Sequence, residues 1–150
     1  MIQEEKMLLI KDLSARLPYA VTVEHTNGFR GTLHDISVHH MYDDNDNVYD
    51  AICYTDFFGD EDSIYIEYFK PYLFPLSSMT EEQKKGLENL GWNFDNFEIH
   101  NVSECLGTYR EYVAHSDCFN LIDWFNKNHF DYRGLISKGL AIDATGLNIY

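Results

Sequence analysis

The spacing of hydrophobic residues changes from a helical period to a strand period after the first proline of the chain. Ile10, Leu13 and Leu17 fall on one side of a helix, with charged residues mostly elsewhere. We therefore expect an amphipathic helix over Ile2–Leu17. Pro18 ends it, because the residue before a proline is pushed out of the helical region of backbone conformation.

Alternating and β-branched residues then predict short antiparallel strands between residues 19 and 69. The expected strands are Ala20–His25, Phe29–Val38, Val48–Phe58 and Ser63–Phe69. Asn27-Gly28 separates the first two and predicts a hairpin with a type I′ turn, because both residues accept positive φ. Polar clusters at 43–47 and 59–62 predict two further turns. A strongly bent sheet or a small SH3-like barrel would close such strands with the fewest open edges.

Two prolines mark the next segment as extended. Lys70–Leu76 contains Pro71 and Pro75 between apolar residues, which predicts a connector lying across the apolar face of the sheet. Thr80-Glu81-Glu82-Gln83 matches the capping-box pattern. A helix is therefore expected to begin after Thr80 and to stop near Gly91.

Helical spacing returns in the last third of the chain, where apolar residues predict a helix over Asp117–His129. Asp131 is expected to cap a last short helix ending at Gly139, and Ala141–Tyr150 is apolar enough to dock on the rest. Trp92–Val102 is expected to hold one more strand. We therefore predict a single α+β domain over residues 1–150, with a β-rich part at 19–69 and three or four helices within 1–18 and 76–150.

Composition excludes several classes of protein. The 150 residues carry 25 acidic and 11 basic side chains, a formal net charge of −14 that argues against binding a nucleic-acid duplex directly. No apolar run is long enough to span a membrane, and the start of the chain lacks the apolar core of a signal peptide. Three cysteines, an odd number, fit reduced thiols in a cytoplasmic protein. No cofactor-binding motif occurs, so no cofactor is expected.

The placement of charge is the most unusual feature of the sequence. Between Gly31 and Phe69 there are ten carboxylates and neither Lys nor Arg. Such a field costs folding free energy through self-repulsion, which invites a functional explanation, a basic surface on a protein partner. The favoured explanation of the charge alone is that acidic turns keep an aromatic-rich sheet soluble, and cation binding ranks last. The acidic residues assigned to partner binding are Asp43, Asp44, Asp46, Asp60, Glu61 and Asp62.

Metal and catalytic patterns are weak by comparison. A calcium loop that starts at Asp43 would need glycine and glutamate where Val48 and Tyr54 stand, and the next register fails as well. His34 and His40 would share one face of a regular strand, close to several carboxylates. They are the basis of an alternative hypothesis, a small hydrolase or metal-dependent enzyme. We assign neither catalytic residues nor metal ligands from the sequence.

Aromatic residues gather near the last predicted helix and suit either packing or a protein contact. Trp124 and Tyr132 lie in a run that also contains Phe130 and Arg133. Trp, Tyr and Arg dominate the centres of protein interfaces, so Trp124 and Tyr132 join the candidate partner-binding residues. The favoured role of the cluster is nevertheless structural, packing the helical part on the sheet.

Three segments of the chain resemble an uncharacterised family of small proteins carried by phages and mobile elements of gut bacteria. The segments are Lys11–Tyr19, Lys70–Glu82 and Phe125–Ala141. The resemblance implies a product made in a bacterial cytoplasm, and it transfers no functional residue. Small acidic proteins in that setting are sometimes inhibitors of host defence. We therefore expect a non-enzymatic protein that acts through protein contacts, with an acidic mimic of nucleic acid as its sharpest form.

Overall fold

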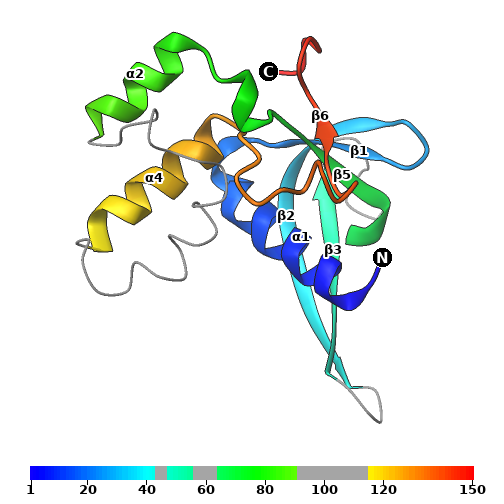
Figure 1. The fold of residues 1–150 in the computed structure, drawn as a ribbon. Helices are drawn as coiled ribbons and strands as arrows, with labels where there is room; N and C mark the ends of the chain where they lie inside the picture. Colours follow the sequence, from blue (N-terminus) through cyan, green and yellow to red (C-terminus); the bar gives the residue numbers. More distant parts are fainter. Residues whose placement is uncertain (43–46, 56–63, 91–114) are drawn as a thin grey trace.

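The computed structural model describes residues 1–42, 47–55, 64–90 and 115–150, and at 39–42, 47–50, 52, 64 and 115–119 it describes the backbone alone. The fold is mixed α+β, as expected. Its described α-helices are α1 (Gln3–Arg16), α2 (Glu81–Asn89) and α4 (His115–Lys127). Figure 1 shows α1 across one face of the sheet, with α2 and α4 forming a pair to one side.

Six strands form one sheet in the order β4-β3-β2-β1-β5-β6. They are β1 (Thr22–His25), β2 (Arg30–Tyr42), β3 (Asn47–Thr55), β4 (Ile64–Tyr65), β5 (Phe69–Leu73) and β6 (Ile142–Asp143). All neighbours are antiparallel except β5 and β6. Among the described strands, the end strands β4 and β6 do not pair with each other, so the sheet is open. An SH3-like barrel is therefore not confirmed.

The hairpin at Asn27-Gly28 is confirmed, but the expected turn type is wrong. Gly28 has a φ of 87°, whereas Asn27 is not among the described residues with positive φ. The Gly28 N–H donates to the His25 carbonyl at 2.8 Å, and the Asn27 side chain accepts from the Phe29 N–H at 3.1 Å. This pattern is a three-residue loop in which only glycine takes the left-handed conformation.

The connector predicted at Lys70–Leu76 is instead a strand inside the sheet. Its first part belongs to β5, which pairs with β1 on one side and with β6 on the other. Pro71 lowers the strand tendency of the segment because it cannot donate to a ladder. Its partner is Val23, and that pairing is the last in the β1–β5 ladder. Contacts far apart in the sequence therefore override the local proline signal.

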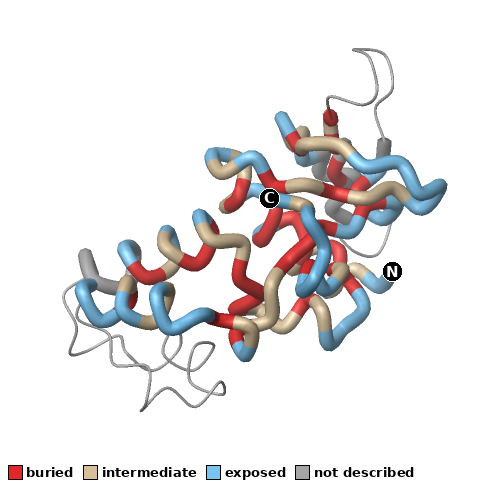
Figure 2. Tube along the Cα trace, turned by 90° about the horizontal axis from the view of Figure 1, so that it is seen from above, coloured by how far each residue is buried: buried red, intermediate tan, exposed pale blue. Residues whose placement is uncertain are grey.

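Helix α1 confirms the first predicted element and covers the main core. Leu9 and Leu13 are fully buried, together with Val23 and Leu73 of the sheet. After Arg16 the chain tightens into a 3₁₀ turn at Leu17–Tyr19, which places Pro18 where no N–H is needed. Figure 2 shows buried residues concentrated where α1 meets the sheet.

A second cluster of buried residues joins α2 to α4. It contains Leu87, Leu121, Phe125 and Phe130, and the Tyr19 hydroxyl adds a hydrogen bond to Asp123 from outside. The last short helix predicted after Asp131 is absent, because residues 131–139 form turns. The Asp131 carboxylate still accepts hydrogen bonds from the backbone N–H groups of Leu135 and Ile136, each at 2.8 Å. It therefore caps these turns and not a helix. The strand predicted at Trp92–Val102 lies outside the described residues.

We expect Thr80→Ala to lower the free energy of unfolding by about 1 kcal/mol, measured by urea denaturation. The capping box predicted for α2 is present: the Thr80 hydroxyl accepts from the Gln83 N–H at 3.2 Å, and the Gln83 side chain accepts from the Thr80 N–H at 2.9 Å. Thr80→Ser keeps the acceptor and is the control. An equal loss in both variants would contradict a capping role for the hydroxyl.

Candidate functional site

The stretch without Lys or Arg forms one half of the sheet. It runs from the second residue of β2 through β3 and β4 to the first residue of β5. Asp35, in β2, is exposed. The acidic residues assigned to partner binding lie outside the described residues: Asp43, Asp44, Asp46, Asp60, Glu61 and Asp62. Asp43, Asp44 and Asp46 belong to the four-residue connection between β2 and β3.

The outer part of the β2–β3 hairpin extends beyond its neighbours. Strand β1 pairs with β2 only as far as Thr32, and β4 pairs with β3 only at Ile52 and Cys53. The β2–β3 ladder continues to the pair of Tyr42 and Asn47. Figure 1 shows this two-stranded ribbon running away from the helices and from the other strands. The described ribbon therefore projects from the rest of the fold.

A bulge in β2 changes the basis of the histidine hypothesis. The register shifts between Leu33, which pairs with Thr55, and Asp35, which pairs with Tyr54. His34 is the extra residue, and its side chain is exposed. A shared face with His40 required unbroken alternation, so the strand argument for bringing the two histidines together no longer holds. For His40 the structure describes the backbone alone.

The described part of the chain contains neither a cluster of metal ligands nor an activated cysteine nucleophile. Within it, no three His, Cys, Asp or Glu side chains come together to hold a metal ion. Cys53 is buried, and that burial, with a contribution from Asp35, raises the pKa of its thiol to about 12. A thiol with such a pKa stays protonated at neutral pH and is a poor nucleophile.

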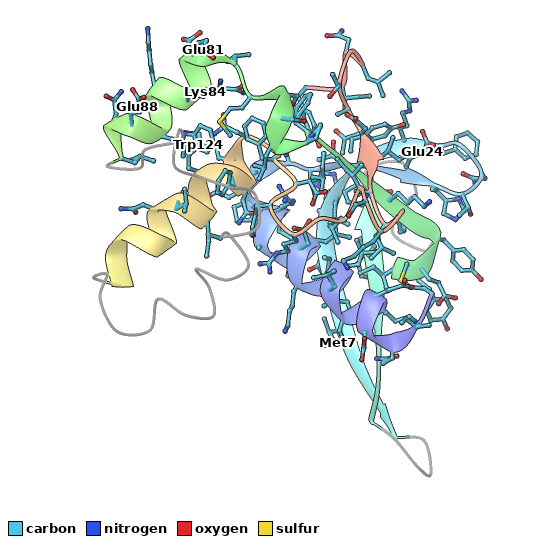
Figure 3. All side chains as sticks on the ribbon, viewed as in Figure 1. Met7, Glu24, Glu81, Lys84, Glu88 and Trp124 are labelled. Atoms are coloured by element: carbon cyan, nitrogen blue, oxygen red, sulfur yellow. The ribbon has the colours of Figure 1, made fainter. Side chains whose placement is uncertain are left out.

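The aromatic candidates Trp124 and Tyr132 lie in the second core cluster. Trp124 is half-buried and stacks on Phe130, with ring centroids 5.6 Å apart and planes 8° apart. Figure 3 shows Trp124 between α4 and α2, where its indole faces Gly86 of α2. Tyr132 is 5% exposed and stacks on Phe125. Both side chains therefore serve packing between elements, and Trp124 keeps some exposed surface.

A buried ion pair that the sequence analysis did not identify joins the two clusters. Asp12 and Arg16 of α1 are both 0% exposed. Arg16 donates from Nε to Asp12 Oδ2 at 2.7 Å and from Nη2 to Asp12 Oδ1 at 3.0 Å. Nη2 also donates to the Phe130 carbonyl at 2.8 Å, and Arg133 Nε lies 3.4 Å from Asp12 Oδ1. The signal in the sequence was an Asp and an Arg four residues apart on a helix.

A second polar group lies on the opposite side of β1. Glu24 accepts hydrogen bonds from the Tyr72 hydroxyl and, at 2.9 Å, from Arg30 Nε. The hydrogen bond from Tyr72 lowers the pKa of Glu24, and burial raises the pKa of Tyr72 to about 12. Arg30 also lies over the Tyr72 ring, with Cζ 4.9 Å from its centroid. These contacts stabilise the pairing of β1 with β2 and β5.

Comparisons with known proteins identify no relative: no family model, no curated protein and no solved structure matches the chain. Of the helices that the structure describes, none combines the length and the apolar character needed to cross a bilayer.

Proposed function

We propose that this protein is a non-enzymatic binding protein that presents its acidic β2–β3 hairpin to a basic surface on a partner protein. The observation that carries the proposal is the projecting ribbon. Beyond Val38 of β2 and before Ala51 of β3, the described strands pair only with each other, whereas Leu33 and Ala51 still pack in the main core. The same segment has no positive side chain. A projecting acidic ribbon fits into a basic groove without requiring the rest of the fold to move.

The sharper form of the proposal is an inhibitor that imitates nucleic acid. Ten carboxylates between Gly31 and Phe69 supply negative charge of the kind that a phosphate backbone supplies. The resemblance of three segments to proteins of phages and mobile elements supports a partner in the bacterial host, such as a defence protein in the cytoplasm. The hydrolase alternative based on His34 and His40 gains no support from the described residues.

The test begins with capture of partners on the immobilised protein from a host lysate at low salt and at 0.5 M salt. A purified partner is then used to measure association rates. We expect association to slow sharply at 0.5 M, where the Debye length is only about 4 Å. An acidic surface that steers a basic partner must show this dependence.

Three substitutions in the hairpin connection test the same idea without changing the buffer. We expect Asp43→Asn, Asp44→Asn and Asp46→Asn together to reduce the association rate by roughly tenfold. The triple variant Asp60→Asn, Glu61→Gln, Asp62→Asn should act in the same direction. The matched control removes three exposed carboxylates elsewhere, by Glu4→Gln, Glu82→Gln and Glu88→Gln. A partner that is indifferent to salt and to both acidic variants would refute the proposal and favour the surface around Trp124.

A further inference from the structure

Strand β2 has an open edge beyond the point where β1 stops. Strand β1 pairs with β2 only as far as Thr32, and the next contact is a hydrogen bond from the Leu33 N–H to the Val21 carbonyl at 2.9 Å. Strand β2 continues to Tyr42, and of the described strands only β3 pairs with this part. Figure 1 shows β2 and β3 running on together away from β1. Residues 36–42 therefore form a border of the described sheet.

The bulge determines which backbone groups point to this open edge. The Leu33 N–H points toward β1, and the extra residue His34 shifts the alternation by one position. The Ile36 N–H therefore points to the same side as that of Leu33 and away from β3. In agreement, it donates to the Asp35 side chain, with Oδ1 at 2.8 Å. Val38, two residues further on, directs its N–H and carbonyl to the same open edge.

The side chains on this part of β2 divide between two faces of different character. Ile36 packs in part against the main core, and Val38, on the same face, is 48% exposed. Asp35 belongs to the opposite face and is exposed. A strand laid beside β2 would therefore place its side chains alternately next to an apolar group and next to a carboxylate.

Charge selects the kind of strand that suits this edge. The segment from Gly31 to Phe69 has ten carboxylates and neither Lys nor Arg. A second copy of the chain would bring an identical segment against it, and repulsion between two chains of net charge −14 opposes that pairing. A strand with Lys or Arg side chains is complementary in charge. Residues 36–42 also contain no Pro and no Lys, the residues that commonly prevent strand addition at an edge.

We propose that the partner protein adds an extended strand to the open edge of β2, in which Lys or Arg residues alternate with apolar residues. The backbone of that strand pairs with Ile36 and Val38, its apolar side chains cover Val38, and its basic side chains lie beside Asp35. The Asp35 carboxylate then exchanges the Ile36 N–H for a basic side chain. This inference rests on the proposed function, because it specifies how the hairpin holds a basic partner.

The first test uses the unaltered chain and two synthetic peptides of about eight residues in which Lys and Val alternate. One peptide has ordinary peptide bonds, and the other is N-methylated at every residue, so the two carry the same charge. At low salt we expect the ordinary peptide to shift the backbone amide resonances of Ile36 and Val38. The methylated peptide should bind at least about tenfold more weakly, because it has no N–H to donate.

Equal binding of the two peptides, or binding of neither, would overturn strand addition. Equal binding that weakens with salt would leave the proposed function standing, because attraction to the acidic segment does not require backbone pairing. The two proposals can therefore fail separately.

The second test blocks the edge of the protein itself. Val38→Pro removes an N–H that points to the open edge and leaves the ladder with β3 intact, so we expect it to weaken binding of the ordinary peptide by roughly tenfold. Val38→Thr keeps the N–H and the branched shape, and as the matched control it should bind within about twofold of the unaltered chain. Equal binding by both variants would overturn the proposal. Should Val38→Pro fail to fold, the two peptides with the unaltered chain decide the question.

A partner captured from the host lysate extends the test to the natural complex. We expect its binding to be weakened by Val38→Pro as well as by the acidic substitutions. A partner that responds to the acidic substitutions alone would overturn strand addition. Analytical ultracentrifugation addresses the remaining occupant: a dimer of the unaltered chain that Val38→Pro dissociates would assign the edge to a second copy and would also overturn the proposal.

Discussion

Arg16→Met is expected to lower the free energy of unfolding by about 3–5 kcal/mol, because it leaves the Asp12 carboxylate buried without its main partner. Asp12 and Arg16 are both 0% exposed. The variant also removes the hydrogen bond from Arg16 to the Phe130 carbonyl, which links α1 to the second core cluster. Urea denaturation measures the loss, and Lys11→Met, at an exposed position of the same helix, should change stability by less than about 0.5 kcal/mol.

The double variant Asp12→Leu with Arg16→Met distinguishes a lost ion pair from lost packing. Replacing both charges by apolar side chains removes the unpaired carboxylate, so we expect it to be clearly more stable than Arg16→Met alone. Arg133 lies 3.4 Å from Asp12 Oδ1 and compensates part of the charge in the single variant. A loss below about 1 kcal/mol for Arg16→Met would mean that the buried pair is not formed.

The protein is expected to lose roughly 3 kcal/mol of stability through His129 as the pH falls from about 6.5 to about 4. The folded pKa of His129 is about 4, against 6.5 for an unperturbed histidine, because burial and the nearby Arg16 disfavour the charged ring. A folded pKa below the unfolded value means that the unfolded chain binds the proton first. The stabilisation is therefore complete above pH 6.5 and is lost on the way down to pH 4.

His129→Asn is the control for this pH dependence, since asparagine tolerates the left-handed conformation and does not titrate. The net charge of −14 also becomes smaller in this range and relieves repulsion, so the difference between the two stability curves is the diagnostic quantity. We expect that difference to become smaller as the pH falls from about 6.5 to about 4.5. Below that value, the lowered pKa of Glu24 adds a loss of stability to both proteins, and this loss cancels in the difference. Parallel curves for the two proteins would contradict a buried, neutral His129.

Local patterns predicted the elements that depend on neighbouring residues. Helix α1, the Asn27-Gly28 hairpin and the capping box at Thr80 are all present as expected. Helix α4 was also predicted, although it begins at His115, two residues before the expected start at Asp117. Each of these features is determined within one or two turns of chain, where periodicity, proline and capping residues act directly.

The candidate sites were predicted less completely, because they depend on contacts between distant residues. The acidic stretch could be found by counting charges, but only the strand pairing shows that it includes the two-stranded outer part of the β2–β3 hairpin. The hydrogen bond from the Tyr150 hydroxyl to the Tyr72 carbonyl had no signal beyond an apolar end segment expected to dock. Its geometry requires Tyr72 and Tyr150, which are 78 residues apart in the chain, to meet.

The amino-acid sequence by itself determined the α+β class, the main helices and the first hairpin. Only the tertiary structure decided that Phe69–Leu73 is a strand, that the sheet is open, and that Asp12 and Arg16 are buried together. The physical reason is the range of the interactions. Helix periods and turn residues act over a few positions, whereas strand order and burial depend on which distant segments exclude water from one another.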